Sequence, residues 1–377
     1  MTDGAAPPIV HPPVVHPPIA PTVPPATIGI LGGGSTVHYF EHRAQQMGYR
    51  TVVLDPSLSA AQLRKSAAGC AVVTVVDQLP LAAMRAVATK LPVYPNPDTV
   101  ELCRDRFAVK GFLADIGVGV GPHMPIETAD DILAAADTKF SAILKLRHHG
   151  AGRDGHVRVA AHVNLLDAWD ALRRRPCVLE QRLTLGRELS VTVARTGDGQ
   201  VVSYPAAQEQ YVHGRLEISY APASLLGSGQ ADAAELGAYI ATELGLVGVL
   251  TVQMFVVGRE VYVHELTLRP NALALYTLDS CRTNQYEQHL RAICGLGLGN
   301  ATMSVPGIAV VSLPAELWAE GEPKWERVLG EGSAHVHRYP GSESTDGAVW
   351  GHLAATSGTA AGSTSVVRRL RKHLTTG

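Results

Sequence analysis

Lys145 and the glycine-rich segment that follows it could together bind a phosphate group. Lys145 stands near the end of an apolar stretch, and residues 149–155 read H-G-A-G-R-D-G. A lysine neutralises phosphate charge, while backbone N–H groups of such a loop donate to the phosphate oxygens. Gly150, Gly152 and Arg153 lie in this loop. A solvated lysine at a strand end has the same appearance, so the pattern alone leaves both interpretations open.

Two carboxylates farther along the chain have the spacing needed to hold a nucleoside. A strand ending at Glu180 can accept a hydrogen bond from an adenine amino group, and the backbone that follows offers donors and acceptors to the ring edge. Glu188, eight residues after Glu180, can accept from ribose hydroxyls. A surface strand with paired charges explains the same residues equally well.

Gln253 and Glu265 are expected on one face of a hairpin that turns at Gly258. Two oxygen ligands placed in this way can hold Mg²⁺ against nucleotide phosphates. Arg269 follows four residues after Glu265 and can steady a transferring phosphoryl group or an anionic substrate. Because Gln253 supplies only a neutral carbonyl oxygen, we expect the metal affinity of this pair to be weak.

The triple glycine at 32–34 follows a short apolar strand, and Asp55 ends the next strand. This order suggests a dinucleotide fingerprint, which requires a third glycine where the following helix packs against the strand. Val37 occupies that place. We therefore interpret the glycines as a tight turn in a doubly wound domain.

The elements that would position these residues follow an α/β pattern at first. Strands separated by a helix at this spacing indicate parallel βαβ units. A mixed set of strands and helices follows. We expect strands at 27–31, 50–54, 71–76, 92–94, 142–146, 157–160, 177–180, 188–194, 201–204, 216–219, 248–256, 260–265 and 308–313. We expect helices at 37–47, 98–116, 231–244, 285–294 and 366–373.

Composition excludes several classes of protein. The chain has 377 residues, 46% of them hydrophobic and 18% charged, as in globular proteins of two or three domains. A net charge of −2 argues against a nucleic-acid binder, and no apolar run is long enough for a membrane-spanning helix. The five cysteines show no C-x-x-C pair, which favours free thiols in a reducing cytoplasm. Residues 1–26 repeat V-H-P-P and should form a mobile tail.

Several stretches together resemble the ATP-grasp superfamily, and more closely the carboxyaminoimidazole ribonucleotide synthases. That resemblance covers about 27–355. The stretches are I-L-G-G-G (30–34), C-R-D-R-F-A-V-K-G-F-L (103–113), C-V-L-E-Q-R-L (177–183), R-E-L-S-V (187–191), E-L-T-L-R-P (265–270) and T-L-D-S-C-R-T-N-Q-Y-E-Q-H-L-R-A-I-C-G-L (277–296).

The resemblance implies an ATP-grasp fold with an N-terminal Rossmann-like βαβ domain and a small C-terminal domain. We expect the boundaries to be 1–26 for the tail, then 27–98, 99–300 and 301–377. It also implies that ATP is bound with Mg²⁺ in a cytoplasmic homodimer. Arg106 and Lys145 would contact phosphates, Glu180, Gln181 and Leu183 the adenine, Glu188 the ribose, and Glu265 the metal.

The sequence departs from the synthase pattern where that family handles bicarbonate and ribonucleotide phosphate. The family's loop G-G-Y-D-G-K-G has lost its Tyr and Lys here, and its first metal Glu is Gln253. Tyr211 and Asn271 stand where the family has histidines. The late Lys and Arg of the family are missing, and only Gly351 and His352 of that motif remain. A phosphomonoester without such cations loses charge-assisted hydrogen bonds worth about 1.5–3 kcal/mol each.

Three functions are compatible with this pattern. The first is an ADP-forming ligase that joins a carboxylate to an amine through an acyl phosphate in specialised-metabolite biosynthesis, with Lys145, Arg153 and Arg269 as catalytic residues. The second is the original carboxyaminoimidazole ribonucleotide synthase, with compensating side chains. The third is a degenerate protein that binds nucleotide without turnover, for which Gln253 argues. We favour the first, because the residues for ATP persist while those for the ribonucleotide do not.

Overall fold

The computed structural model describes residues 20–76, 81–135, 141–148, 155–159, 164–183, 186–212, 214–339 and 349–375. Its internal contacts divide the chain into two compact units. Unit 1 contains Asp98–Arg187 and Met254–Glu265, and unit 2 contains Glu188–Gln253, Leu266 onward and the segment that ends at Pro97. This grouping differs from the three expected domains, whose boundaries therefore stay a prediction.

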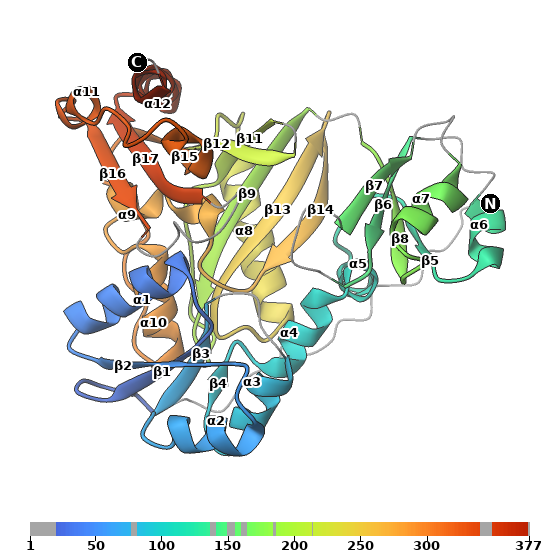
Figure 1. The fold of residues 1–377 in the computed structure, drawn as a ribbon, viewed down its shortest axis with the longest axis horizontal. Coiled ribbons are helices and arrows are strands. Elements are labelled where there is room, and N and C mark those ends of the chain that lie inside the picture. Colours follow the sequence, from blue (N-terminus) through green and yellow to red (C-terminus); the bar gives the residue numbers. More distant parts are fainter. Residues whose placement is uncertain are drawn as a thin grey trace. The chain divides into compact units, whose positions relative to one another are not determined.

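Unit 2 begins with a small parallel sheet in the strand order β2-β1-β3-β4. Gly29 allows β1 to lie close to its neighbour, because a Cβ at this position would come within 2.9 Å of Val73 Cγ2. The expected βαβ arrangement is confirmed, with two further helices (Figure 1). The elements are β1 Thr27–Leu31, α1 Ser35–Gln46, β2 Arg50–Leu54, α2 Ala60–Ala67, β3 Val72–Val75, α3 Leu81–Ala88 and β4 Val93–Tyr94.

A second, 9-stranded sheet has the order β14-β13-β9-β11-β12-β15-β17-β16, with β10 paired to β9. Its strands are β9 Arg187–Arg195, β10 Val201–Ser203, β11 Ala207–Val212, β12 Arg215–Ala221, β13 Gly248–Val257, β14 Glu260–Thr267, β15 Gly307–Pro314, β16 Ala334–Arg338 and β17 Val349–Ser357. The helices that accompany it are α8 Gly229–Glu243, η2 Ala272–Ala274, α9 Thr277–Ser280, α10 Gln285–Ile293, η3 Ala315–Trp318, α11 Glu326–Leu329 and α12 Ala360–Thr375.

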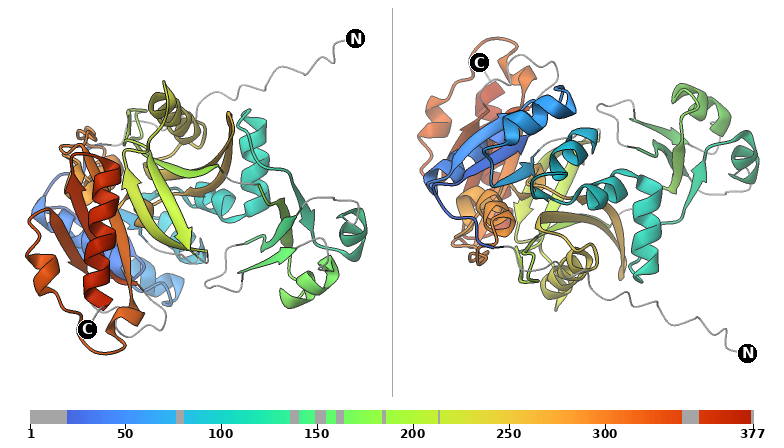
Figure 2. Two further views of the ribbon diagram at one scale, coloured as in Figure 1. Left: turned by 90° about the horizontal axis from the view of Figure 1, so that it is seen from above. Right: turned by 90° about the horizontal axis from the view of Figure 1, so that it is seen from below.

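Apolar faces hold unit 2 together. Helix α12 lies along β15 and β17 (Figure 2), where Val367 and Leu370 pack against Val311 and Leu353. Helices α1 and α10 share a core with the small parallel sheet. Burying each such side chain contributes about 1.5–3 kcal/mol, so each of these apolar clusters stabilises the elements that it joins.

His289 of α10 joins three elements inside this core. Its Nε2 lies 2.7 Å from Thr74 Oγ1 in β3, and its Nδ1 accepts from the N–H of Val249 in β13 at 3.2 Å. Gly248 has a φ of +126°, and a Cβ there would come within 2.8 Å of the imidazole. Burial lowers the pKa of His289 to about 3, so the ring is neutral and structural.

Unit 1 contains an antiparallel sheet in the order β5-β8-β6-β7, with helices α6 and α7 packed on one face (Figure 1). Ile126, Leu144 and Leu179 point toward Trp169 of α7 in the core on that face. The elements are α4 Pro97–Arg104, α5 Arg106–Asp115, β5 His123–Ile126, α6 Ala129–Ala135, β6 Ala142–Leu146, β7 His156–Val159, α7 Leu165–Ala171 and β8 Cys177–Gln181.

The single helix expected at 98–116 is wrong in one respect, because the chain breaks at Asp105. Asp105 is extended (φ −94°, ψ 106°), and its carboxylate caps α5 by accepting from the N–H groups of Phe107 and Ala108. An N-cap aspartate competes with helix continuation, so two helices form in place of one.

The tail expected at 1–26 does not extend through its last residues. Residues 1–19 lie outside the described part of the chain, but the N–H of Thr22 donates to Cys294 O at 2.8 Å. The hydroxyl of Tyr49 donates to Thr22 O at 2.7 Å. Proline content therefore does not prevent residues 20–26 from packing against unit 2.

Two further expectations concern absences. The five cysteines are free thiols in the structure, as expected. Within the described residues, no helix combines the length and apolar character needed to cross a bilayer.

Candidate functional site

Lys145 and Glu180 form an ion pair on the face of the unit 1 sheet that α6 and α7 leave uncovered. Strand β6 alternates, so Leu144 and Leu146 enter the core while Lys145 points the other way. Antiparallel register places Glu180 opposite Ile143, on the same face as Lys145. The Nζ of Lys145 lies 2.8 Å from Glu180 Oε2.

Lys110 adds a second ammonium group to this pair. Its Nζ lies 3.7 Å from the other carboxylate oxygen of Glu180, and the lysine is only 4% exposed. Burial alone would raise the pKa of Glu180, but the charges of Lys145 and Lys110 outweigh it and lower this pKa to about 2. Burial lowers the pKa of Lys110, and Glu180 partly opposes that shift. Glu180 is thus ionised, and two cations surround one carboxylate.

Arg106 extends the positive cluster at the first turn of α5. Its backbone N–H donates to Arg147 O at 2.8 Å, and Arg147 also pairs with the capping carboxylate of Asp105 at 2.8 Å. The guanidinium Nη1 of Arg106 lies 3.9 Å from Glu265 Oε2 in β14. Arg106, Lys110 and Lys145 therefore give unit 1 three cations around two carboxylates, an arrangement suited to nucleotide phosphates.

His264 is a half-buried neighbour of this cluster that the sequence patterns do not reveal. Its ring stacks on Phe255 with centroids 4.6 Å apart, and its Nδ1 has no hydrogen-bond partner among the described residues. Burial, assisted by the charge of Lys145, lowers the pKa of His264 to about 3. Lys110 was similarly unassigned, although it follows Arg106 by four residues and so shares its helix face.

Glu188 lies in unit 2, in strand β9. It stands directly opposite Glu209 in the β9–β11 ladder. Glu209 is 5% exposed and accepts a hydrogen bond of 2.5 Å from Ser190 Oγ. Burial first, and then the charge of Glu188, raise the pKa of Glu209 to about 8. No sequence pattern points to Glu209, because burial of a glutamate depends on tertiary packing.

Gln253 and Arg269 also belong to unit 2. The Oε1 of Gln253 lies 3.4 Å from the hydroxyl of Tyr211, which can donate to it. Arg269 Nη1 donates to Pro270 O at 3.5 Å. Asn271 makes several hydrogen bonds: its side-chain amide donates to Thr251 Oγ1 at 2.7 Å, and its backbone N–H donates to Gln285 Oε1 at 2.9 Å. These contacts fix the polar residues that follow β14.

The residues expected to form one site are thus distributed over two units. Unit 1 brings together Lys145, Glu180, Arg106 and Glu265. Gln181 and Leu183 follow in the same strand and its extension, and the N–H of Gln181 already donates to Pro122 O at 2.9 Å. Unit 2 carries Glu188, Gln253 and Arg269. Gly150, Gly152 and Arg153 lie outside the described residues.

Glu180 is ion-paired with Lys145 through its Oε2, in line with the alternative of paired charges, while its Oε1 has no hydrogen-bond partner among the described residues. Its role toward adenine stays a prediction. The roles of Gln181, Leu183 and Glu188 toward a nucleoside stay predictions, as do those of Glu265 and Gln253 toward a metal.

Known proteins resemble this chain in sequence and in fold. Residues 111–286 match the family model of the ATP-grasp domain. The N5-carboxyaminoimidazole ribonucleotide synthase of Bacillus subtilis is 29% identical over 351 residues, which cover 88% of this chain and 91% of that protein. A bifunctional purine synthesis protein, purC/E, of Dictyostelium discoideum is also 29% identical over 88% of the chain, which spans 37% of that longer protein.

Among solved structures, the N5-carboxyaminoimidazole ribonucleotide synthetase of Thermus thermophilus has a TM-score of 0.84 at 28% identity. The match covers 93% of this chain and 99% of the other. The expected fold and resemblance are confirmed. The chain matches the ATP-grasp domain over residues 111–286, resembles the N5-carboxyaminoimidazole ribonucleotide synthases, and is an ATP-dependent ligase of the kind that forms carbon–nitrogen bonds.

Proposed function

We propose that this protein uses ATP to convert a carboxylate into an acyl phosphate and then transfers the acyl carbon to an amine nitrogen. The carboxylate oxygen attacks the γ-phosphorus, and ADP leaves. The amine then attacks the carbonyl carbon, a C–N bond forms, and phosphate leaves with the C–O bond electrons. The amine loses one proton in this step. Such chemistry depends mainly on positioning and on stabilising negative charge.

The observation that carries this proposal is the cationic cluster of unit 1. Arg106, Lys110 and Lys145 each lie within 3.9 Å of the carboxylate of Glu180 or Glu265. A polyphosphate entering this cluster would replace or join these carboxylates as the counter-charge. The cluster supports retained ATP chemistry, whatever acid and amine are used.

Magnesium is part of this proposal, although the ligands are weaker than two carboxylates. Glu265 offers a charged oxygen, and Gln253 offers a neutral one that already lies near the Tyr211 hydroxyl. Mg²⁺ is commonly held by one or two carboxylates together with substrate phosphates and water. We therefore expect Mg²⁺ to bind mainly through the nucleotide.

The acceptor side favours a substrate other than a ribonucleotide. Asn271 hydrogen-bonds Thr251 and is held by Gln285, so it does not reproduce an imidazole at that place. His352, which remains from the family motif, hydrogen-bonds with Tyr339 at 2.8 Å. Neither group supplies the positive charge that a phosphomonoester requires. We favour an organic carboxylate and an amine from a specialised pathway.

A second candidate is supported by the comparisons. Synthases named for carboxyaminoimidazole ribonucleotide resemble this chain over almost their full length. In that reaction bicarbonate is the acid and aminoimidazole ribonucleotide is the amine, so the chemical steps are the same. Arg147 or Arg269 would then have to compensate for the missing cations.

An ADP-release assay separates the two candidates. The purified protein is supplied with MgATP and either aminoimidazole ribonucleotide plus bicarbonate or a panel of amino acids and amines. Turnover only within the panel supports the first candidate, and robust turnover with the ribonucleotide supports the second. Lys145→Met serves as the control that removes phosphate charge without touching either acceptor. The expected homodimer and cytoplasmic location also remain proposals, and light scattering tests the former.

A further inference from the structure

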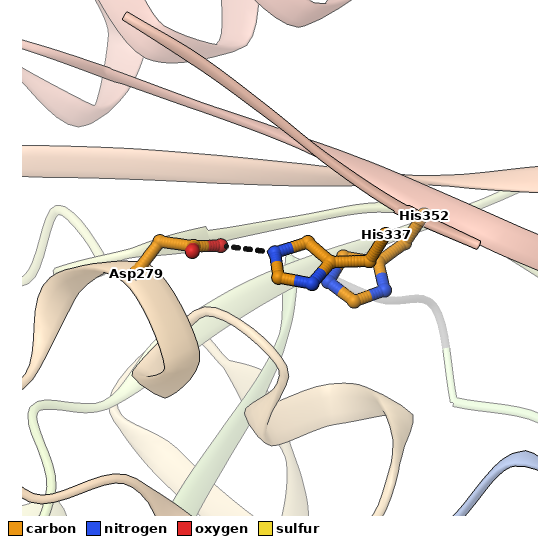
Figure 3. Close-up of side chains that lie close together, drawn as sticks. All are labelled: Asp279, His337 and His352. Atoms are coloured by element: carbon orange, nitrogen blue, oxygen red, sulfur yellow. Dashed lines mark hydrogen bonds and ion pairs between the residues drawn. The ribbon is translucent and has the colours of Figure 1, made fainter. Parts of the chain in front are cut away.

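Three histidines and an aspartate gather in unit 2, where helix α9 meets the edge of the large sheet. Asp279 lies in α9, His335 and His337 lie in β16, and His352 lies in β17. Asp279, His337 and His352 each offer a ligand atom, and these atoms all lie within 4.8 Å of one another. Figure 3 shows Asp279 and His337 pointing toward each other, with the His352 ring against that of His337.

Asp279 contacts the two more exposed histidines of this cluster. Its Oδ2 lies 2.9 Å from His337 Nε2, and its Oδ1 lies 3.7 Å from His335 Nδ1. Residues 335 and 337 point to the same side of β16 because side chains alternate along a strand. The two imidazoles therefore approach one carboxylate from neighbouring positions, and the 43% exposed His335 side chain leaves a path to solvent.

His352 is the buried member of the cluster, and one of its ring nitrogens has no hydrogen-bond partner among the described residues. The side chain is 1% exposed, and its Nδ1 lies 2.8 Å from the hydroxyl of Tyr339. Its Nε2 is buried and has no hydrogen-bond partner among the described residues. Buried polar atoms are rarely left unpaired, so an orphan imidazole nitrogen beside an aspartate–histidine pair points to a missing ligand.

The contact with Tyr339 is the kind that orients a metal-binding histidine. When the Nδ1–H of His352 donates to the Tyr339 oxygen, Nε2 keeps the lone pair that a metal requires, and the contact holds the ring in place. Burial and the nearby His337 hold the pKa of His352 well below its ordinary value. A neutral imidazole is the form that binds a metal, since protonation would occupy the lone pair.

We propose that Asp279, His337 and His352 form a binding site for one divalent transition-metal ion, with Zn²⁺ the best match and His335 close enough to complete its shell. Two or three imidazole nitrogens and one carboxylate oxygen suit Zn²⁺ and other first-row metals, and they do not suit Mg²⁺, which prefers oxygen ligands. The ion would replace the hydrogen bond between Asp279 and His337, and would link α9 to β16 and β17.

Metal binding requires a small rearrangement of the rings. His337 and His352 are stacked, with centroids 4.2 Å apart and planes at 8°. Parallel rings do not direct two lone pairs at one point, so His337 must rotate when the metal enters. His337 is 21% exposed and its partner Asp279 is 11% exposed, which leaves room for that rotation at the sheet edge.

The test is Zn²⁺ titration of the full chain by calorimetry, repeated with Co²⁺ to record the absorption of a tetrahedral complex. His11→Gln and His16→Gln are introduced in every protein, because the N-terminal histidines are a second source of binding. We expect one Zn²⁺ per chain, a Co²⁺ spectrum with nitrogen ligands, and a melting temperature that rises with Zn²⁺ but not with Mg²⁺.

Matched variants decide whether the binding occurs at this site. Asp279→Asn and His337→Gln should each weaken Zn²⁺ binding by about 100-fold or more, and Tyr339→Phe by about 10–100-fold through loss of orientation. His42→Gln, on α1, is the control and should bind Zn²⁺ as the parent does. Melting without metal identifies any variant that misfolds, in which case the other substitution decides. The proposal is overturned if no Zn²⁺ binds, or if folded Asp279→Asn and His337→Gln proteins bind it unchanged.

Discussion

The ammonium group of Lys145 and the carboxylate of Glu180 are held 2.8 Å apart by two neighbouring antiparallel strands. The strand register, and not chance proximity, brings them together, because residues 143 and 180 are directly opposite and residue 145 is next on the same face. A third group, Lys110, enters from α5 and leaves the pair with an excess positive charge. This excess of positive charge is the reason for proposing that the cluster binds phosphate.

Glu180→Gln should destabilise unit 1 strongly. The substitution leaves the buried ammonium of Lys110 and that of Lys145 without their carboxylate, and breaking a buried pair costs about 3–5 kcal/mol. The free energy of unfolding in urea measures the loss. Glu127→Gln is the control, since its exposed pair with Arg147 is worth less than about 1 kcal/mol.

The pH dependence of stability in acid should provide a second test of the ion pair between Glu180 and Lys145. The folded-state pKa of Glu180 is lowered to about 2, below its ordinary value, so its contribution to stability is present at neutral pH. It is lost as the pH falls from about 5 toward 2, where the folded carboxylate becomes protonated. Parent and Glu180→Gln should therefore converge in stability over this range. Curves that stay parallel would contradict the depressed pKa.

Glu209→Gln should stabilise the protein at high pH. The folded-state pKa of Glu209 is raised to about 8. The contribution of its neutral carboxyl to stability is therefore fully present below the ordinary pKa of a glutamate and is lost as the pH rises through 8. The glutamine side chain of the variant imitates the neutral acid and does not ionise. We expect equal stability near pH 5 and a gain on the order of 3 kcal/mol for the variant near pH 9. Urea unfolding at the two pH values measures it.

Gln253→Glu should lower the Mg²⁺ concentration needed for ADP release. A second charged oxygen adds to that of Glu265 and matches the preference of Mg²⁺ for carboxylates. The Tyr211 hydroxyl can donate to the new carboxylate as it does to the amide. A Mg²⁺ titration of turnover checks this, with Tyr211→Phe as the companion variant. An unchanged midpoint would place Gln253 away from the metal.

Deletion of residues 1–19 and deletion of residues 1–26 should differ in effect. The shorter deletion should leave the melting temperature unchanged, because no periodic apolar face exists in that sequence. The longer one removes Thr22, which bonds to Cys294 and Tyr49, and should lower melting by several degrees. Equal melting of both proteins would show that the Thr22 contacts contribute nothing.

Much of the fold was predictable because local patterns and the final packing agree. The strands around Ile28 and Val52, the helix at 285–294 and the hairpin at Gly258 carry strong periodicity or turn residues, and the structure has them. The elements that were missed include α2, α3, α6 and α7 and strands β5, β11, β16 and β17. Most of them are short or polar, such as A-H-V-H-R in β16, and they form because a neighbouring strand pairs with them or a sheet packs against them. Strand β17 is longer and largely buried, and its pairing with β15 and β16 is not visible in the sequence.

The site was predictable only where a residue could be read from motif position. Lys145 and Glu265 were selected in this way and Arg106 through the resemblance, and their roles stay predictions. Glu209 and His264 were not selected, because the sequence does not show that Glu209 will be buried beside a sheet partner or that His264 will stack on an aromatic ring. The pairing of Glu180 with Lys145 was missed for the same reason: it depends on the register of β6 and β8.

Glu188→Gln should test the nucleoside assignment and the electrostatics of unit 2 together. If Glu188 accepts from ribose hydroxyls, loss of its charge should weaken ADP binding by about 1–3 kcal/mol, which calorimetry measures as a roughly 5- to 150-fold increase in Kd. Glu188 also helps to raise the pKa of Glu209, so the pH midpoint of the Glu209-dependent stability change should move down in the same variant. Glu235→Gln, a change on α8, is the control for both measurements. A shifted midpoint with unchanged ADP affinity would keep the Glu188–Glu209 coupling and remove Glu188 from the nucleotide site. An unchanged midpoint would instead mean that the two carboxylates, although opposite in the ladder, are screened from each other.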